Sequence, residues 1–134
     1  MGVSRIGSPV DIAISGLRAE AMRMKVIAEN IANAHTTRTE SGEPYRRKSV
    51  VLEAGRGVEG VAIKEIVADT TTGFKDVFMP GHPDADDQGV VRMPNVDLPV
   101  EMINMVVASR AYQANAAILK RYQDMVNATL ELLR

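Results

Sequence analysis

The sequence predicts an α+β fold in which long N- and C-terminal helices pack as a coiled-coil pair and flank a small β-rich middle module. Two observations favour this fold. Apolar residues recur every three to four positions near both ends of the chain, and glycine, proline and β-branched residues concentrate between them. We therefore divide the chain into an N-terminal helix and exit turn at residues 1–38, a β-rich module at 39–96 and a C-terminal helix at 97–134.

The first helix is expected to begin at Pro9, because Ser8 can cap it and Asp11 places a negative charge in its first turn. After that start, apolar residues follow each other at alternating spacings of four and three. This 3.5-residue repeat is the pattern of a coiled-coil seam. The residues of the seam are Val10, Ile14, Leu17, Ala21, Met24, Ala28 and Ile31.

The last helix is expected to begin near Asp97 and Pro99 and to run to Arg134. Its stripe keeps the same four-and-three spacing and is apolar except at Ser109 and Gln123. Such a helix would be about 54 Å long, which is more than this short chain can cover, so it implies a partner helix. The stripe consists of Leu98, Met102, Met105, Ser109, Tyr112, Ala116, Leu119, Gln123, Val126, Leu130 and Leu133.

Four strands are expected between the helices, because runs rich in Val and Ile alternate there with Gly and Pro. These runs are residues 47–53, 58–68, 75–79 and 90–93. The core of the chain must rely on aliphatic side chains, since aromatic residues make up only 4% of the sequence.

Composition excludes several functions for these 134 residues. The formal net charge of −1 argues against a general nucleic-acid binder and against a polybasic membrane anchor, because both carry an excess of basic residues. The absence of Cys excludes disulfides, zinc fingers, iron–sulfur clusters and thiol catalysis. No apolar run approaches the roughly 20 residues that span a bilayer, and Met1–Ile6 lacks a signal-peptide core. We expect no direct membrane insertion, and any export to proceed without a cleaved signal.

Two motifs imitate ligand sites. Residues 55–60 match G-x-G-x-x-G, but a strand and not a helix is expected to follow, so a glycine-rich turn is favoured over nucleotide binding. The loop at 81–89 gathers His82, Asp84, Asp86 and Asp87 without the spacing of an EF-hand, which favours a rigid polar loop and leaves ion binding open. We expect no catalytic residue, no cofactor and no dedicated metal site.

Several segments resemble the bacterial flagellar axial proteins, which build the rod and the hook. Residues 24–37 are similar to the signature that ends their N-terminal helix, and residues 100–105 and 109–115 are similar to their shared C-terminal element. The continuation at 38–48 departs from the T-x-G-Y ending of hook and distal-rod proteins. That continuation and residues 80–85 and 93–97 resemble the proximal-rod members, so the similarity covers nearly the whole chain.

The resemblance implies a structural protein that self-assembles through its terminal helices into the proximal rod, a hollow helical shaft that transmits torque in the periplasm. It implies export by the flagellar type III apparatus, and as partners other rod proteins and the protein at the junction of rod and MS ring. A soluble coiled-coil adaptor that binds a partner helix is the alternative, and a small nucleotide- or metal-dependent enzyme is a third interpretation.

We expect assembly contacts at the two seams and at the exit turn of the first helix, where Asn and Thr side chains can bond the free backbone groups of a helix end. The candidate residues are Leu17, Met24, Ile31, Ala32, Asn33, Thr36, Glu101, Met102, Met105, Arg110, Tyr112, Asn115, Leu119, Val126 and Leu130.

Overall fold

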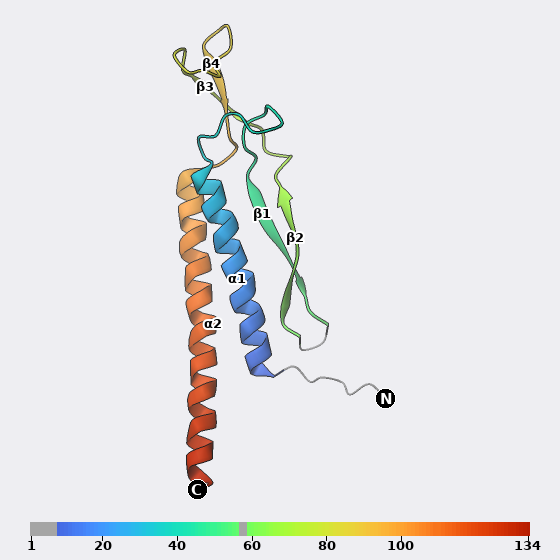
Figure 1. The fold of residues 1–134 in the computed structure, drawn as a ribbon, viewed down its shortest axis with the longest axis vertical. Coiled ribbons are helices and arrows are strands. Elements are labelled where there is room, and N and C mark those ends of the chain that lie inside the picture. The colour runs from blue at the N-terminus through green and yellow to red at the C-terminus, as the bar shows by residue number, and fades with distance from the viewer. Residues whose placement is uncertain (1–7, 57–58) are drawn as a thin grey trace. The chain divides into compact units, whose positions relative to one another are not determined.

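The computed structural model describes residues 8–56 and 59–134 (Figure 1). Expectations for Met1–Ile6 and for the middle of the glycine-rich motif, at residues 57–58, lie outside the described residues. The chain is α+β, as the sequence predicts. Its elements follow the order α1, β1, β2, β3, β4, α2.

Helix α1 spans Pro9–Ala32. The Ser8 hydroxyl accepts a hydrogen bond from the Asp11 N–H at 3.2 Å, and the Ser8 N–H donates to Asp11 Oδ2 at 3.1 Å. These reciprocal bonds form a capping box, which satisfies two backbone donors and makes Pro9 the first helical residue. The predicted start of this helix is confirmed.

The middle of the chain forms two separate two-stranded sheets. Strand β1 (Lys48–Ala54) pairs with β2 (Val61–Ala68), and backbone bonds from Gly55 to Gly60 and from Asp69 to Arg47 bracket the pair, so the two strands run antiparallel. Strand β3 (Lys75–Phe78) pairs antiparallel with β4 (Val90–Met93), with Lys75 opposite Met93. All four predicted strands are confirmed to within a few residues.

Helix α2 spans Leu98–Leu132, which confirms the predicted C-terminal helix. Asp97 precedes it as the cap: its carbonyl accepts the Glu101 N–H at 2.9 Å and its Oδ1 accepts the Val100 N–H at 3.3 Å. Within the described residues, neither helix combines the length and the apolar character needed to cross a membrane.

The chain divides into two compact units. The end unit comprises Met1–Met24, Val50–Glu65 and Val106–Arg134, and the central unit comprises Lys25–Ser49 and Ile66–Met105. Each unit therefore combines parts of both long helices with part of the β-rich middle. In the central unit, Ala34, Tyr45 and Val96 form an apolar core against which Leu98 packs.

In the end unit, neighbouring residues of α1, Gly16 and Ser15, make close contacts with α2 and β2. A Cβ at Gly16 would lie 2.9 Å from the side-chain amide of Asn115, so the glycine lets the two helices approach each other there. Ser15 accepts a hydrogen bond from the Val61 N–H at 3.1 Å and donates one to the Ile12 carbonyl at 2.7 Å. Through Ser15, the start of β2 is attached to α1.

Candidate functional site

A cluster of buried polar side chains joins the helices to the strands in the central unit. We call it the Asn30 cluster; it consists of Asn30, Tyr45, Arg47, Lys48 and Glu101. Asn30 on α1 and Glu101 on α2 are both 0% exposed. Buried polar groups at such positions are costly unless each finds a partner, so the pairing of this cluster decides whether it stabilises the chain.

Asn30 uses its side-chain amide in full. Its Oδ1 accepts the Lys48 N–H and the Tyr45 hydroxyl, each at 2.9 Å. Its Nδ2 donates to the Lys48 carbonyl at 2.8 Å and to Glu101 Oε2 at 3.4 Å. Since both backbone groups of Lys48 bond to this one side chain, Asn30 fixes the first residue of β1 against α1.

Glu101 links α2 to the same segment. Its Oε1 forms an ion pair with the Arg47 guanidinium, whose side chain is 28% exposed. Its Oε2 accepts from Asn30, so both carboxylate oxygens are paired although the residue is fully buried. Glu101 was predicted as an assembly contact, and in the structure its buried carboxylate pairs with Arg47 and Asn30.

Asn95 also binds the segment that leads into β1. It is almost fully buried, and its Oδ1 accepts the Arg47 N–H at 2.7 Å. Its Nδ2 donates to the carbonyls of Asp69 and Thr72, each at 3.1 Å. Asn30 and Asn95 thus bind consecutive residues, Lys48 and Arg47, and together they set the point at which the chain enters β1.

The exit turn of α1 contains Asn33 and Thr36, as predicted. The Asn33 N–H and its Nδ2 both donate to the Glu29 carbonyl, at 3.0 and 2.9 Å. The Thr36 hydroxyl donates to Asn33 Oδ1 at 3.1 Å. The Glu29 carbonyl thus accepts both a backbone and a side-chain bond from Asn33, directly after α1 ends at Ala32.

Two side chains of the central unit have shifted acidities. Burial, followed by the negative charges of Glu29 and Glu101, raises the pKa of the Tyr45 phenol above its ordinary value. Hydrogen bonds from Thr72 and Thr71 lower the pKa of Asp69, which receives their two backbone N–H groups and the Thr71 hydroxyl. Burial and neighbouring negative charges therefore account for the first pKa shift, and hydrogen bonding accounts for the second.

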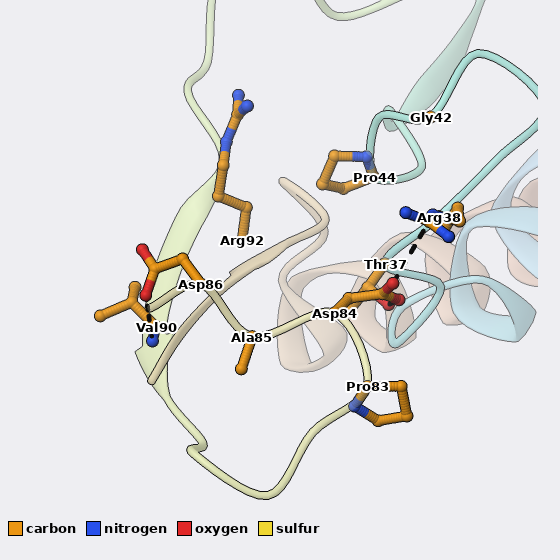
Figure 2. Close-up of a pocket in the computed structure, with 10 residues that line it drawn as sticks. All are labelled: Thr37, Arg38, Gly42, Pro44, Pro83, Asp84, Ala85, Asp86, Val90 and Arg92. Atoms are coloured by element: carbon orange, nitrogen blue, oxygen red, sulfur yellow. Dashed lines mark hydrogen bonds and ion pairs between the residues drawn. The ribbon is translucent and has the colours of Figure 1, made fainter. Parts of the chain in front are cut away.

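The polar loop at 81–89 lines a hollow of about 290 Å³ (Figure 2). Asp84 accepts the Thr37 hydroxyl at 2.6 Å and forms an ion pair with Arg38, while Asp86 accepts the Val90 N–H at 2.9 Å. His82 Nδ1 accepts the Asp84 N–H at 3.0 Å. Asp84 thus ties the loop to residues 37 and 38, while Asp86 and His82 bond to nearby backbone N–H groups. In the described part of the chain, no three acidic or His side chains gather as metal ligands.

Helix α2 exposes a long apolar stripe that residues 8–56 and 59–134 leave uncovered. We call it the outer stripe. Its large side chains are between 46% (Val100) and 86% (Leu132) exposed, an unusual density of solvent-exposed apolar residues for one helix. Helical geometry puts all of its members on one side of the helix. They are Val100, Ile103, Val107, Ala114, Ile118, Met125 and Leu132.

The least exposed side of α2 differs from the predicted seam at every second position. Met105 and Leu119 lie on both. At the other four positions, the least exposed side holds the residue directly before the predicted one: Glu101 before Met102, Ala108 before Ser109, Asn115 before Ala116 and Tyr122 before Gln123. Among the other predicted residues, Leu17, Met24, Ile31, Asn33, Thr36 and Asn115 are half-buried, and Ala32, Met102, Arg110, Tyr112, Val126 and Leu130 are exposed.

Sequence reasoning missed four residues that organise the central unit: Asn30, Tyr45, Arg47 and Asn95. Asn is a poor helix former, so Asn30 inside an otherwise regular helix was a signal that a tertiary partner holds it. The sequence carries no comparable signal for Asn95, which lies between elements and whose partners are backbone groups distant in sequence.

Two family models match parts of the chain. The model described as "Flagella basal body rod protein" covers residues 11–38, which include most of α1 and its exit turn. The model described as "Flagellar basal body rod FlgEFG protein C-terminal" covers residues 87–132, which include β4 and all of α2.

Curated relatives match most of the chain. The flagellar basal-body rod protein FlgC of Yersinia enterocolitica is 43% identical over 126 residues, which are 91% of this chain and 93% of the relative. The protein of the same name from Agrobacterium fabrum is 41% identical over 128 residues, 92% of this chain and 91% of the relative. That from Aquifex aeolicus is 34% identical over 131 residues, 94% and 96% of the two chains. The names describe structural rod proteins and no enzyme.

Proposed function

The chain belongs to the FlgC family of flagellar basal-body rod proteins and is a structural component of the rod, and we propose that it assembles there through its two long helices. The coarse function follows from the family. The proposal concerns which surfaces meet, how the helices pair and where the assembled protein lies.

The outer stripe of α2 is the observation that carries the proposal. Covering an exposed apolar side chain of this size contributes about 1.5–3 kcal/mol, and the isolated chain does not realise that free energy for the stripe. A helix that leaves one apolar side open along its length is typical of a subunit whose remaining contacts come from its neighbours. The predicted contacts at Met102, Val126 and Leu130 are exposed as well and are available to neighbours.

We infer that α1 and α2 pair as an antiparallel coiled coil. Gly16 lies against Asn115 in the end unit, and Asn30 bonds to Glu101 in the central unit. The two contacts are separated by two heptads on α1 and by two heptads on α2, which supports a single coiled-coil register for the helix pair. The half-buried seam residues Leu17, Met24, Ile31, Met105 and Leu119 fit such a pair.

The proposed assembly is an open helix. A contact between two different surfaces, repeated by a rotation that does not close, generates a filament, and a hollow shaft of this symmetry can transmit torque. The partners we propose are other copies of the chain, other rod proteins and the protein at the junction of rod and MS ring. The rod would lie in the periplasm, with export by the flagellar type III apparatus and no cleaved signal.

A soluble coiled-coil adaptor would also use exposed heptad surfaces, but the printed names of the relatives favour the rod. An adaptor would form one defined small complex, whereas a rod subunit self-associates into a polymer.

Replacement of Val107 by Asp tests the proposal. Val107 lies on the outer stripe, and Gln113, about 120° around the same helix, supplies the control Gln113→Asp. Both positions are exposed, so neither variant should unfold the isolated chain. We expect Val107→Asp to be exported but absent from purified basal bodies, with loss of motility, and Gln113→Asp to assemble. Equal incorporation of the two variants would refute a role of the outer stripe.

A further inference from the structure

The C-terminal end of α2 extends beyond the start of α1, and this overhang has an apolar side. In the end unit, Gly16 lies against Asn115, so in an antiparallel pair Pro9 is level with Tyr122. The capping box of Ser8 and Asp11 begins α1 at Pro9. Residues 123–132 of α2, about 15 Å of helix, therefore extend past α1 (Figure 1).

The side of the overhang that continues the α1-facing side of α2 is apolar. Val126, Leu130 and Leu133 follow the spacing of that side, and they are 39%, 59% and 79% exposed. Along residues 101–122, the corresponding side chains are buried or half-buried, except that of Tyr112, which is 37% exposed. The apolar side of α2 thus continues beyond the level at which the described part of α1 begins.

A groove that matches this overhang lies on the same unit. It has a volume of about 260 Å³ and lies at the start of α1, between that helix and α2. Its walls are apolar apart from one amide, and its lining residues are Pro9, Ile12, Ala13, Asn115 and Ile118. Ile12 of α1 and Ile118 of α2, both exposed, are the two large aliphatic side chains that line it.

We propose that the overhang of one copy of the chain binds in the Ile12–Ile118 groove of a second copy, shifted along the helices by about the length of the overhang. The groove ends where the overhang begins, so a chain cannot bend its own straight helix back into its own groove. A second copy can bind the overhang of the first copy in its groove. Its own overhang is then free to bind in the groove of a third copy. The contact joins two different surfaces, so it propagates as an open row. This inference rests on the proposed assembly through the helices.

Disulfide cross-linking tests the contact, because the natural sequence contains no Cys. Within one chain, Ile12 and Leu130 are about 16 Å apart along the helix, and a disulfide needs Cα atoms within about 7 Å. Any disulfide in the double variant Ile12→Cys/Leu130→Cys must therefore join two copies. We expect mild oxidation of basal bodies that contain this variant, and of the concentrated purified variant, to give dimers and higher species.

Three controls make the result specific. Each single variant alone should remain monomeric, and a mixture of the two single variants should give dimers only. The pair Arg18→Cys/Leu130→Cys moves the α1 thiol to an exposed position outside the groove and should give no ladder. Equal cross-linking of the Arg18 pair, a dimer of Ile12→Cys alone, or a product whose mass shows a different rod protein would overturn the inference.

The inference and the proposed assembly fail in different ways. If Val107→Asp blocks incorporation and no Ile12–Leu130 cross-link forms, the end contact is wrong and assembly through α2 stands. If Val107→Asp assembles normally, the proposed assembly is wrong whatever the cross-linking shows.

Discussion

Asn30 and Glu101 are 71 residues apart in the chain, yet the Asn30 amide donates a hydrogen bond to Glu101 Oε2 at 3.4 Å in a fully buried site. This contact joins the C-terminal part of α1 to the first turn of α2 within the central unit. Since Asn30 also binds Lys48 through both backbone groups, the same side chain positions β1. The free energy of this unit therefore depends on polar geometry as well as on apolar burial.

We predict that Asn30→Ala destabilises the chain by about 3 kcal/mol, because it leaves the backbone groups of Lys48 and the Tyr45 hydroxyl buried without their partner. Urea unfolding monitored by circular dichroism measures the change. Asn127→Ala, at an exposed site on α2, is the matched control and should change stability by less than about 0.5 kcal/mol. Equal effects of the two substitutions would show that the bonds of Asn30 contribute little.

The ion pair between Arg47 and Glu101 should show strong coupling. Arg47→Met leaves a buried carboxylate without its cation, which costs about 3 kcal/mol or more. In a double-mutant cycle with Glu101→Gln, the double variant should be less destabilised than the two single changes added together, by about 1–3 kcal/mol.

The exposed pair of Arg46 and Glu43, 3.7 Å apart, provides the comparison for that cycle. Its coupling energy should not exceed about 1 kcal/mol, since solvent screens it. A coupling for Arg47 and Glu101 as small as this would contradict their assignment as a buried pair.

Tyr45 should make the chain sensitive to alkali. Its pKa is higher in the folded chain than the ordinary value of about 10, so folding favours the neutral phenol. The associated stability is fully present below pH 10 and is lost as the pH rises through the raised pKa of the folded state. Unfolding free energies measured from pH 8 to 12 should fall more steeply for the natural chain than for Tyr45→Phe. Parallel curves would exclude Tyr45 as the source.

Two glycines with the same backbone conformation should respond differently to alanine. Gly60 and Gly42 have φ angles of 80° and 81°. A Cβ at Gly60 would lie 2.1 Å from the Ser15 hydroxyl, whereas a Cβ at Gly42 would meet nothing within 4 Å. Gly42→Ala should cost about 1 kcal/mol from backbone strain alone. Gly60→Ala should cost more, because it displaces Ser15 from Val61, and thermal denaturation of both variants measures the difference.

The elements of the fold could be predicted from local patterns. Ser8, Pro9 and Asp11 define the start of α1, and runs of β-branched residues between glycines and prolines define the strands, since these signals act within a few residues of where they stand. The Asn30 cluster could not be predicted in this way. Its members come from three places in the sequence, around residues 30, 45–48 and 101, and hydrogen-bond partners distant in sequence leave no periodic pattern.

The covered side of α2 was predicted incorrectly for a different reason. The apolar periodicity predicts Met102 on the covered side. Met102 is exposed, however, whereas the neighbouring Glu101 is fully buried. The side that faces the chain itself holds small and polar residues such as Ala108 and Asn115, because a close approach at Gly16 and a paired carboxylate are accommodated there. In a chain that exposes apolar residues along a helix, hydrophobicity alone does not identify the intramolecular side.

Labelling of a single thiol would test most directly the claim that assembly covers the outer stripe. Val107→Cys and Gln113→Cys each introduce the only Cys of the chain. Both thiols should react with a maleimide in the free protein, since both positions are exposed. In intact basal bodies, we expect the thiol at position 107 to be protected while the thiol at position 113 still reacts. Equal reactivity of the two thiols in intact basal bodies would show that assembly leaves the outer stripe uncovered.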